Sequence, residues 1–152
     1  MLILEGFQAG LSWLTILKKR EHFRKAFNYF DVACIAAYDE DKITELMQNK
    51  GIVRNRRKIC AAIQNAKVFL AIQKEYGTFS EYLWGFTNHQ VQYLQDKEMP
   101  VTTPLSDSIS KDLKKRGMKF VGSTIIYSYL QAVGVVHDHH KGCFLHVDDS
   151  NN

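Results

Sequence analysis

Apolar residues recur along most of this chain at intervals of three and four positions, the spacing of one buried helix face. The pattern is clearest over residues 55–76, where the predicted stripe consists of Ile59, Ile63, Ala66, Phe69 and Leu70. Residues 122–133 differ, because apolar side chains occur almost all round that predicted helix. Such a helix belongs at the centre of a domain. No segment alternates apolar and polar residues convincingly, so the pattern predicts an all-α fold.

Residues suited to helix N-caps precede most of the other predicted helices. The candidate caps are Ser12, Asp31, Asp39, Ser80 and either Ser106 or Asp107, for helices over 13–27, 32–38, 40–51, 81–86 and 107–116. In the helix over 13–27, Leu14, Leu17, Phe23 and Phe27 are predicted to face inward. Residues 88–104 hold both prolines and are predicted to form an exposed loop. The sequence therefore predicts a series of helices with one long irregular connection.

The first thirteen residues are apolar and rich in glycine. They predict the last turn of an apolar helix, with Glu5 where the helix ends, then a loop from Gly6 to Gly10. Trp13 follows across the glycines and would begin the next helix.

The length of 152 residues favours a single domain over 1–152. The composition, 45% hydrophobic and 24% charged, is that of a globular protein, and no run reaches the roughly 18 apolar residues of a membrane helix. Three cysteines at no framework spacing favour a reducing cytosol, and Cys34 and Cys60 are predicted to be buried thiols. The net charge of +4 is mild and permits a polyanion as partner.

Residues 114–134 predict a helix, a tight turn and a second helix. Gly117 suits the left-handed residue after a helix end, and Gly122 would begin the next helix with its first amides uncovered, which favours an anion. Lys114, Lys115, Arg116 and Lys119 surround this turn, so the anion would be a DNA phosphate. The basic start of the helix from residue 55 opposes its dipole and would need a compensating group, for example a bound phosphate. An ordinary helix turn in a helical protein is the alternative for 114–134.

Four of the six histidines lie in the tail, over residues 137–146. His139 and Cys143 are four residues apart, a spacing that suits two zinc ligands on one helical turn. Two ligands do not complete a structural zinc site, so a polar, partly frayed terminus is the alternative. Ser128 is a small hydroxyl on the apolar helix, either bonded back to its own helix or facing a cavity.

Three stretches together resemble the family of DNA-3-methyladenine glycosylase I, a constitutive bacterial alkylation-repair enzyme. They are LEGFQAGLSWLTILKKRE (4–21), GIVRNRRKICAAIQNA (51–66), and LKKRGMKFVGSTIIYSYLQAVG (113–134) followed by HDHHKGC (137–143). The resemblance extends over essentially the whole chain. It implies a helix-hairpin-helix fold and hydrolysis of the N-glycosidic bond of 3-methyladenine flipped out of duplex DNA, leaving an abasic site.

The resemblance also implies roles for single residues. Glu5 matches the pocket carboxylate that hydrogen-bonds the adenine edge, Trp13 the ring that stacks on the base, and Ser128 a pocket-lining hydroxyl. Gly10 and Leu11 match the loop that fills the gap left by the flipped nucleotide. Lys119 and Gly122 belong to the DNA-binding hairpin, and His139 and Cys143 match two of the four ligands of a structural zinc ion.

The chain departs from the family at its front, where family members carry roughly one more helix-and-loop segment with pocket aromatics and the other two zinc ligands. An N-terminally truncated glycosylase domain is therefore expected, as a monomer in the cytoplasm acting on double-stranded DNA with alkylated bases. The alternatives are a catalytically impaired DNA-binding remnant and a misfolding fragment. Other helix-hairpin-helix glycosylases often use an aspartate after the second helix; Asp138 is the only candidate, and it ranks below Glu5. No Schiff-base lyase step is expected.

Overall fold

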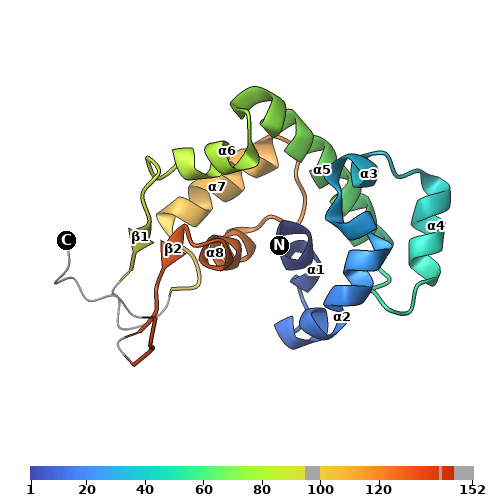
Figure 1. Ribbon diagram of the computed structural model, residues 1–152, viewed down its shortest axis with the longest axis horizontal. Coiled ribbons are helices and arrows are strands. Elements are labelled where there is room, and N and C mark those ends of the chain that lie inside the picture. The colour runs from blue at the N-terminus through green and yellow to red at the C-terminus, as the bar shows by residue number, and fades with distance from the viewer. Residues whose placement is uncertain (95–99, 141, 146–152) are drawn as a thin grey trace.

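The computed structural model describes residues 1–94, 100–140 and 142–145. It is built mainly from helices, as the sequence pattern predicted (Figure 1). The helices are α1 (Leu2–Gln8), α2 (Trp13–Ala26), the 3-10 turn η1 (Asn28–Phe30), α3 (Val32–Ala36), α4 (Glu40–Gln48), α5 (Arg56–Tyr76), α6 (Phe79–Gly85), α7 (Pro104–Lys115) and α8 (Ser123–Ala132). Two short strands, β1 (Gln92–Tyr93) and β2 (Val136–His137), complete the described part.

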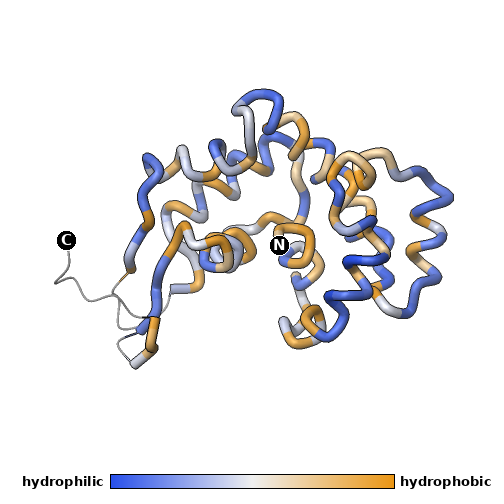
Figure 2. Tube along the Cα trace, viewed as in Figure 1, coloured by the Kyte–Doolittle hydropathy of each residue, from blue (hydrophilic) through white to orange (hydrophobic). Residues whose placement is uncertain are grey.

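The hydrophobic core has two halves, and α5 contributes to both of them. Ile59 to Ala66 of α5 pack with α1, α2, α3 and α4, whereas Val68 and Ile72 pack with α6, α7 and α8. In Figure 1, α5 runs between the two groups of helices, and α1 lies near the centre beside α8. Figure 2 shows α1 as mostly hydrophobic and the peripheral α4 as mostly hydrophilic. The mostly apolar α1 therefore lies where the two halves meet.

Several helix starts agree with the predicted caps. The side chains of Ser12, Asp31 and Asp39 each accept a hydrogen bond from a main-chain amide in the first turn of the helix that follows. Asn55, for which no cap was predicted, does the same for α5. Two predicted caps were wrong. Thr78, not Ser80, caps α6, and Thr103 caps α7 with Pro104 in its first turn. Thr103 and Pro104 lie within residues 88–104, which the two prolines predict to be a loop, so the pattern places the start of α7 too late.

The paired strands are a feature that the sequence pattern missed. Gln92 pairs with Val136 and Tyr93 with His137 in a parallel register. Two residues are too short for any periodicity to be visible in the sequence. The pairing ties the long connection after α6 to the chain that leaves α8.

Burial differs from the prediction at two cysteines and two leucines. Cys34 and Cys60 were predicted to be buried, but both are exposed. On α2, Leu14 is 59% exposed and Leu17 is also exposed, and Ile16 is buried in their place.

Helix α1 extends to Gln8, so the predicted loop from Gly6 begins too early and Glu5 lies in mid-helix. Within the described residues, no helix is both long and apolar enough to span a membrane.

Helix α7 is joined to α5 and α6 by Arg116, its C-cap residue. The guanidinium Nε donates to Asp112 at 2.6 Å, Nη1 donates to Glu75 at 2.6 Å and Nη2 donates to the Tyr76 hydroxyl at 2.9 Å. Asp112 also accepts a hydrogen bond from Tyr82 of α6 at 2.8 Å. Arg116 was predicted to lie beside a DNA phosphate, but its guanidinium is instead engaged by these carboxylates.

We expect Arg116→Met to destabilise the fold at neutral pH by about 1 kcal/mol, and by less in acid. The Arg116 guanidinium holds the pKa of Glu75 below its ordinary value, and hydrogen bonds from Arg116 and Tyr82 lower the pKa of Asp112 against the opposing effect of burial. Stability from a lowered carboxyl pKa is complete above the unfolded value and is lost as the pH falls through the folded value. Urea unfolding at pH 7 and at about pH 2.5 measures this, and an equal loss at both pH values would contradict the assignment.

Candidate active site

Glu5 is the buried carboxylate of α1. Its side chain is 4% exposed, between the buried residues Leu4 and Phe7 in sequence. Burial raises the pKa of Glu5, and the positive charge of the Met1 ammonium opposes that rise. A buried carboxylate beside apolar residues is costly, which makes it a candidate functional group and an unusual structural one.

Trp13 begins α2 and is half-buried. It packs against the core half that also contains Phe7 and Phe23. Helices α1 and α2 pack together and are joined by only four residues, 9–12. Glu5 and Trp13 therefore lie on adjoining elements of the same core half.

The connection between α1 and α2 forms a closed turn with an exposed tip. The Leu11 amide donates to the Gln8 carbonyl at 2.7 Å, and the Gln8 side-chain amide donates to the Leu11 carbonyl at 2.8 Å. Gly10 has a φ of +76°, which disfavours any residue with a Cβ, and a Cβ there would meet nothing within 4 Å. Leu11 is exposed. The structure therefore presents an apolar side chain on a short, hydrogen-bonded loop.

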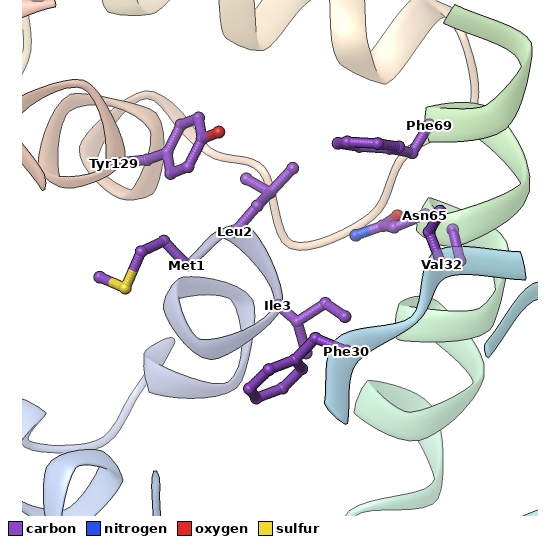
Figure 3. Close-up of a pocket in the computed structure, with 9 residues that line it drawn as sticks. Met1, Leu2, Ile3, Phe30, Val32, Asn65, Phe69 and Tyr129 are labelled. Carbon is purple, nitrogen blue, oxygen red and sulfur yellow. The ribbon is translucent and has the colours of Figure 1, made fainter. Parts of the chain in front are cut away.

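A cavity of about 250 Å³ lies where α1, α5, α8 and the segment around η1 meet. Its lining is mostly apolar: Met1, Leu2, Ile3, Phe30, Val32, Asn65, Ala66, Phe69 and Tyr129. In Figure 3, Leu2 of α1 lies between Tyr129 of α8 and Phe69 of α5. Glu5, Trp13 and Ser128 are not among the residues that line this cavity. None of the residues that line this cavity was predicted from the sequence to be a site residue.

Phe30 reaches the cavity from a strained turn. Asn28, Tyr29 and Phe30 all have positive φ, between +48° and +63°. The Tyr38 hydroxyl donates to the Asn28 side chain at 2.6 Å, and the Asp31 amide donates to the Asn28 carbonyl at 3.0 Å. Each such residue costs on the order of 1 kcal/mol, so the surrounding structure must hold the turn. No local motif in the sequence indicates this turn.

Gly122 begins α8 as predicted. It is the N-cap residue and provides no side-chain cap, and Gly117 has the left-handed φ of +101° expected after α7. The main chain of Lys119 is engaged by α5. Its N–H donates to Asn65 Oδ1 and its carbonyl accepts from Asn65 Nδ2, both at 2.8 Å. The amides available to an anion are therefore those of the first turn of α8, beyond Lys119.

The basic start of α5 is compensated by protein groups. Arg56 is hydrogen-bonded to Glu40, and Lys58 donates to the carbonyls of Phe7 and Ala9 at 2.9 and 2.5 Å. A bound phosphate is not needed to explain either residue. No pattern in the sequence indicates these partners, because Glu40 is 16 positions from Arg56, and Phe7 and Ala9 are 51 and 49 positions from Lys58.

The chain after α8 folds back onto that helix through Asp138. Its carboxylate accepts hydrogen bonds from the Tyr127 hydroxyl at 2.5 Å and from Gln131 Nε2 at 2.6 Å. These two hydrogen bonds tie the chain just after β2 to α8. Ser128 lies half-buried on the same helix.

His139 and Cys143 come together as predicted, with His139 Nδ1 and Cys143 Sγ 3.4 Å apart. Two ligands on one tetrahedral zinc ion would be separated by roughly 3.5 Å, given their usual bond lengths. The pair therefore fits a zinc site in geometry and chemistry. Among the described residues, no group of three or more histidine, cysteine or acidic side chains is placed to hold a metal. His146 and the rest of the tail lie outside the described residues.

Comparison with known proteins decides the family. A family model described as methyladenine glycosylase matches residues 1–146. This chain belongs to the methyladenine glycosylase family. It is 49% identical over 146 residues to DNA-3-methyladenine glycosylase 1 of Escherichia coli, covering 94% of this chain and 78% of the relative.

Solved structures agree with this membership. A crystal structure of 3-methyladenine DNA glycosylase I superposes with a TM-score of 0.91 at 49% identity, covering 96% of this chain and 82% of the other. A tyrosine-to-phenylalanine variant of a 3-methyladenine DNA glycosylase I, in complex with 3-methyladenine, also gives a TM-score of 0.91, at 37% identity. It covers 97% of this chain and 81% of that one. The all-α architecture of this methyladenine glycosylase is therefore that of its relatives.

Proposed function

We propose that this chain hydrolyses the N-glycosidic bond of 3-methyladenine in alkylated double-stranded DNA and leaves an abasic site. The proposal depends on the similarity of this chain, over 94% of its length, to DNA-3-methyladenine glycosylase 1 of Escherichia coli. The buried Glu5 on α1 supports it, since a cationic lesion is a partner for which a buried carboxylate is suited.

In this mechanism Glu5 and Trp13 recognise the extruded base. The methylated base is cationic before cleavage, so an ionised Glu5 forms a charge-assisted hydrogen bond with its exocyclic amine. The indole face of Trp13 attracts the same cation by roughly 0.5–2 kcal/mol, and the Ser128 hydroxyl is assigned to the same base-binding site. Normal adenine is neutral and gains neither interaction fully. The base leaves as a neutral molecule, so cleavage needs little acid–base help.

DNA is held by the turn between α7 and α8, which we assign as the hairpin of a helix-hairpin-helix motif. The uncovered amides that follow Gly122 bind a backbone phosphate at the positive end of the α8 dipole. Lys119 is exposed beside them and adds a positive charge. Leu11, on its loop with Gly10, fills the gap left in the duplex by the extruded nucleotide.

The reaction is monofunctional in this proposal. The cavity between α1, α5 and α8 is lined by no lysine, and the buried Lys58 is engaged by two carbonyls. No Schiff-base step is part of this proposal, and borohydride should trap no adduct with abasic DNA.

His139 and Cys143 are proposed as two ligands of a structural zinc ion, which would hold the chain after β2 in a fixed turn. Adding zinc is then expected to raise the midpoint of thermal unfolding, and Cys143→Ser should remove most of that rise. Cys34→Ser, at an exposed cysteine of α3, is the matched control and should respond as the original chain does. An equal rise in all three proteins would exclude this site.

The proposed activity is tested by incubating the purified chain with duplex DNA treated with a methylating agent and separating the released bases. Release of 3-methyladenine without strand cleavage is the expected result. Salt-sensitive binding to the duplex without base release would instead indicate a catalytically impaired DNA-binding protein. If the chain neither bound alkylated DNA nor released a base from it, both assignments would be overturned.

A further inference from the structure

Three elements that are far apart in the sequence meet at one junction: α1, α5 and the turn over residues 116–122 between α7 and α8. Gly6 of α1 faces this turn, since a Cβ at Gly6 would lie 3.8 Å from both the Cβ and the carbonyl oxygen of Phe120, an ordinary van der Waals separation. The cavity at this junction has a volume of only about 10 Å³, and its lining includes Gly6, Lys58, Asn65, Lys119 and Phe120. The junction is therefore closely packed, and a shift of one element must move the others.

Asn65 fixes the turn to α5. Its side-chain amide donates to the Lys119 carbonyl and accepts from the Lys119 amide, both at 2.8 Å. Two antiparallel hydrogen bonds to one residue define orientation as well as distance. The next residue, Phe120, has a φ of +55°, a conformation that costs free energy and persists only where its surroundings hold it.

Lys58 fixes the end of α1 to the same helix. Its side chain is buried, and its ammonium donates to the carbonyls of Phe7 and Ala9, where α1 ends and the loop of Gly10 and Leu11 begins. A cation suits the negative end of the α1 dipole. The ammonium also lies 5.9 Å from the centre of the Phe120 ring, so Lys58 contacts both elements that α5 holds.

Lys58 and Asn65 are seven residues apart on α5, which places them on one face of the helix, two turns and about 10.5 Å apart. One rigid helix thus fixes the start of the Leu11 loop and the turn before Gly122. Burying a lysine costs free energy, and burial lowers the pKa of Lys58. A buried apolar residue would pack here at lower cost, but it could not bind the two carbonyls.

We propose that Lys58 and Asn65 are positioning residues that set the distance between the loop of Gly10 and Leu11 and the phosphate-binding start of α8. This inference rests on the proposed function, in which the loop enters the duplex while α8 holds the strand. Both contacts must be made on one deformed duplex, and a misplacement of about 1 Å can cost on the order of 100-fold in rate. Neither residue contacts the base or the DNA in this scheme.

The test compares Lys58→Met and Asn65→Ala with the original chain, using a duplex that contains a tetrahydrofuran abasic analogue. We expect each substitution to weaken binding about 10-fold or more. For Lys58→Met, the slope of affinity against salt concentration should stay unchanged and the affinity for free 3-methyladenine should stay within about twofold. Gln48→Ala, an amide truncation at an exposed position of α4, is the control and should bind as the original chain does.

Two outcomes would count against the positioning role. A salt slope that falls by about one in Lys58→Met would show that Lys58 contacts a phosphate directly. Lower thermal stability with unchanged duplex affinity in both variants would show a purely structural role. If the original chain released no 3-methyladenine, yet both variants still bound the abasic duplex more weakly, the enzymatic function would fail and the positioning role would stand.

Discussion

Glu5→Gln is expected to reduce the release of 3-methyladenine from alkylated DNA by about 100-fold. The substitution keeps the shape of the side chain and removes its charge, and a hydrogen bond to a charged group contributes about 1.5–3 kcal/mol. The measurement is single-turnover base release at pH 7. Glu45→Gln, at an exposed glutamate of α4, is the control and should retain full activity. Release within threefold of the original chain would exclude Glu5 from base recognition.

The pH dependence provides a second test of Glu5. Its raised pKa means that the carboxylate gains a proton at a higher pH than an ordinary glutamate, whose value is 4.5. Base release should therefore fall as the pH drops through the raised pKa, and Glu5→Gln should lack this step. A raised carboxyl pKa also means that ionised Glu5 costs stability at neutral pH. The glutamine variant should thus be at least as stable as the original chain, and unfolding cannot explain its lower activity.

Phe7→Ala is expected to cause the largest loss of stability, about 4 kcal/mol. Phe7 is 1% exposed, and its ring centre lies 4.7 Å from that of Phe23 and 5.7 Å from that of Phe27. Truncation leaves a cavity that these two rings cannot fill without moving. For a domain of this size the loss corresponds to a fall in the unfolding midpoint of roughly 12 °C.

Thermal unfolding followed by circular dichroism checks this prediction. Leu17→Ala is the matched control, since Leu17 is an apolar residue of α2 that is 44% exposed. It should shift the midpoint by no more than about 2 °C. Similar shifts in the two variants would contradict the assignment of Phe7 to the core.

Part of the candidate site, the turn between α7 and α8, could be predicted from local sequence. Residues 114–134 predicted two helices with a left-handed Gly117 and an uncapped Gly122, and the structure has both features. That prediction succeeded because each feature depends on residues within one turn of it. The roles assigned to Glu5, Trp13 and Ser128 came from the resemblance to a family and stay predictions. The family itself is confirmed by the match over residues 1–146.

The sequence by itself determined the all-α class, most helix boundaries and the family. Helical periodicity and caps such as Ser12 and Asp39 depend on neighbours three or four positions away, and these are visible in the sequence. Only the tertiary structure decided which polar groups meet. Lys58 reaches carbonyls 51 and 49 positions away, Asn65 reaches Lys119 54 positions away, and Arg116 reaches Glu75 41 positions away. Such pairings depend on how the helices pack, and no pattern within one helix specifies them.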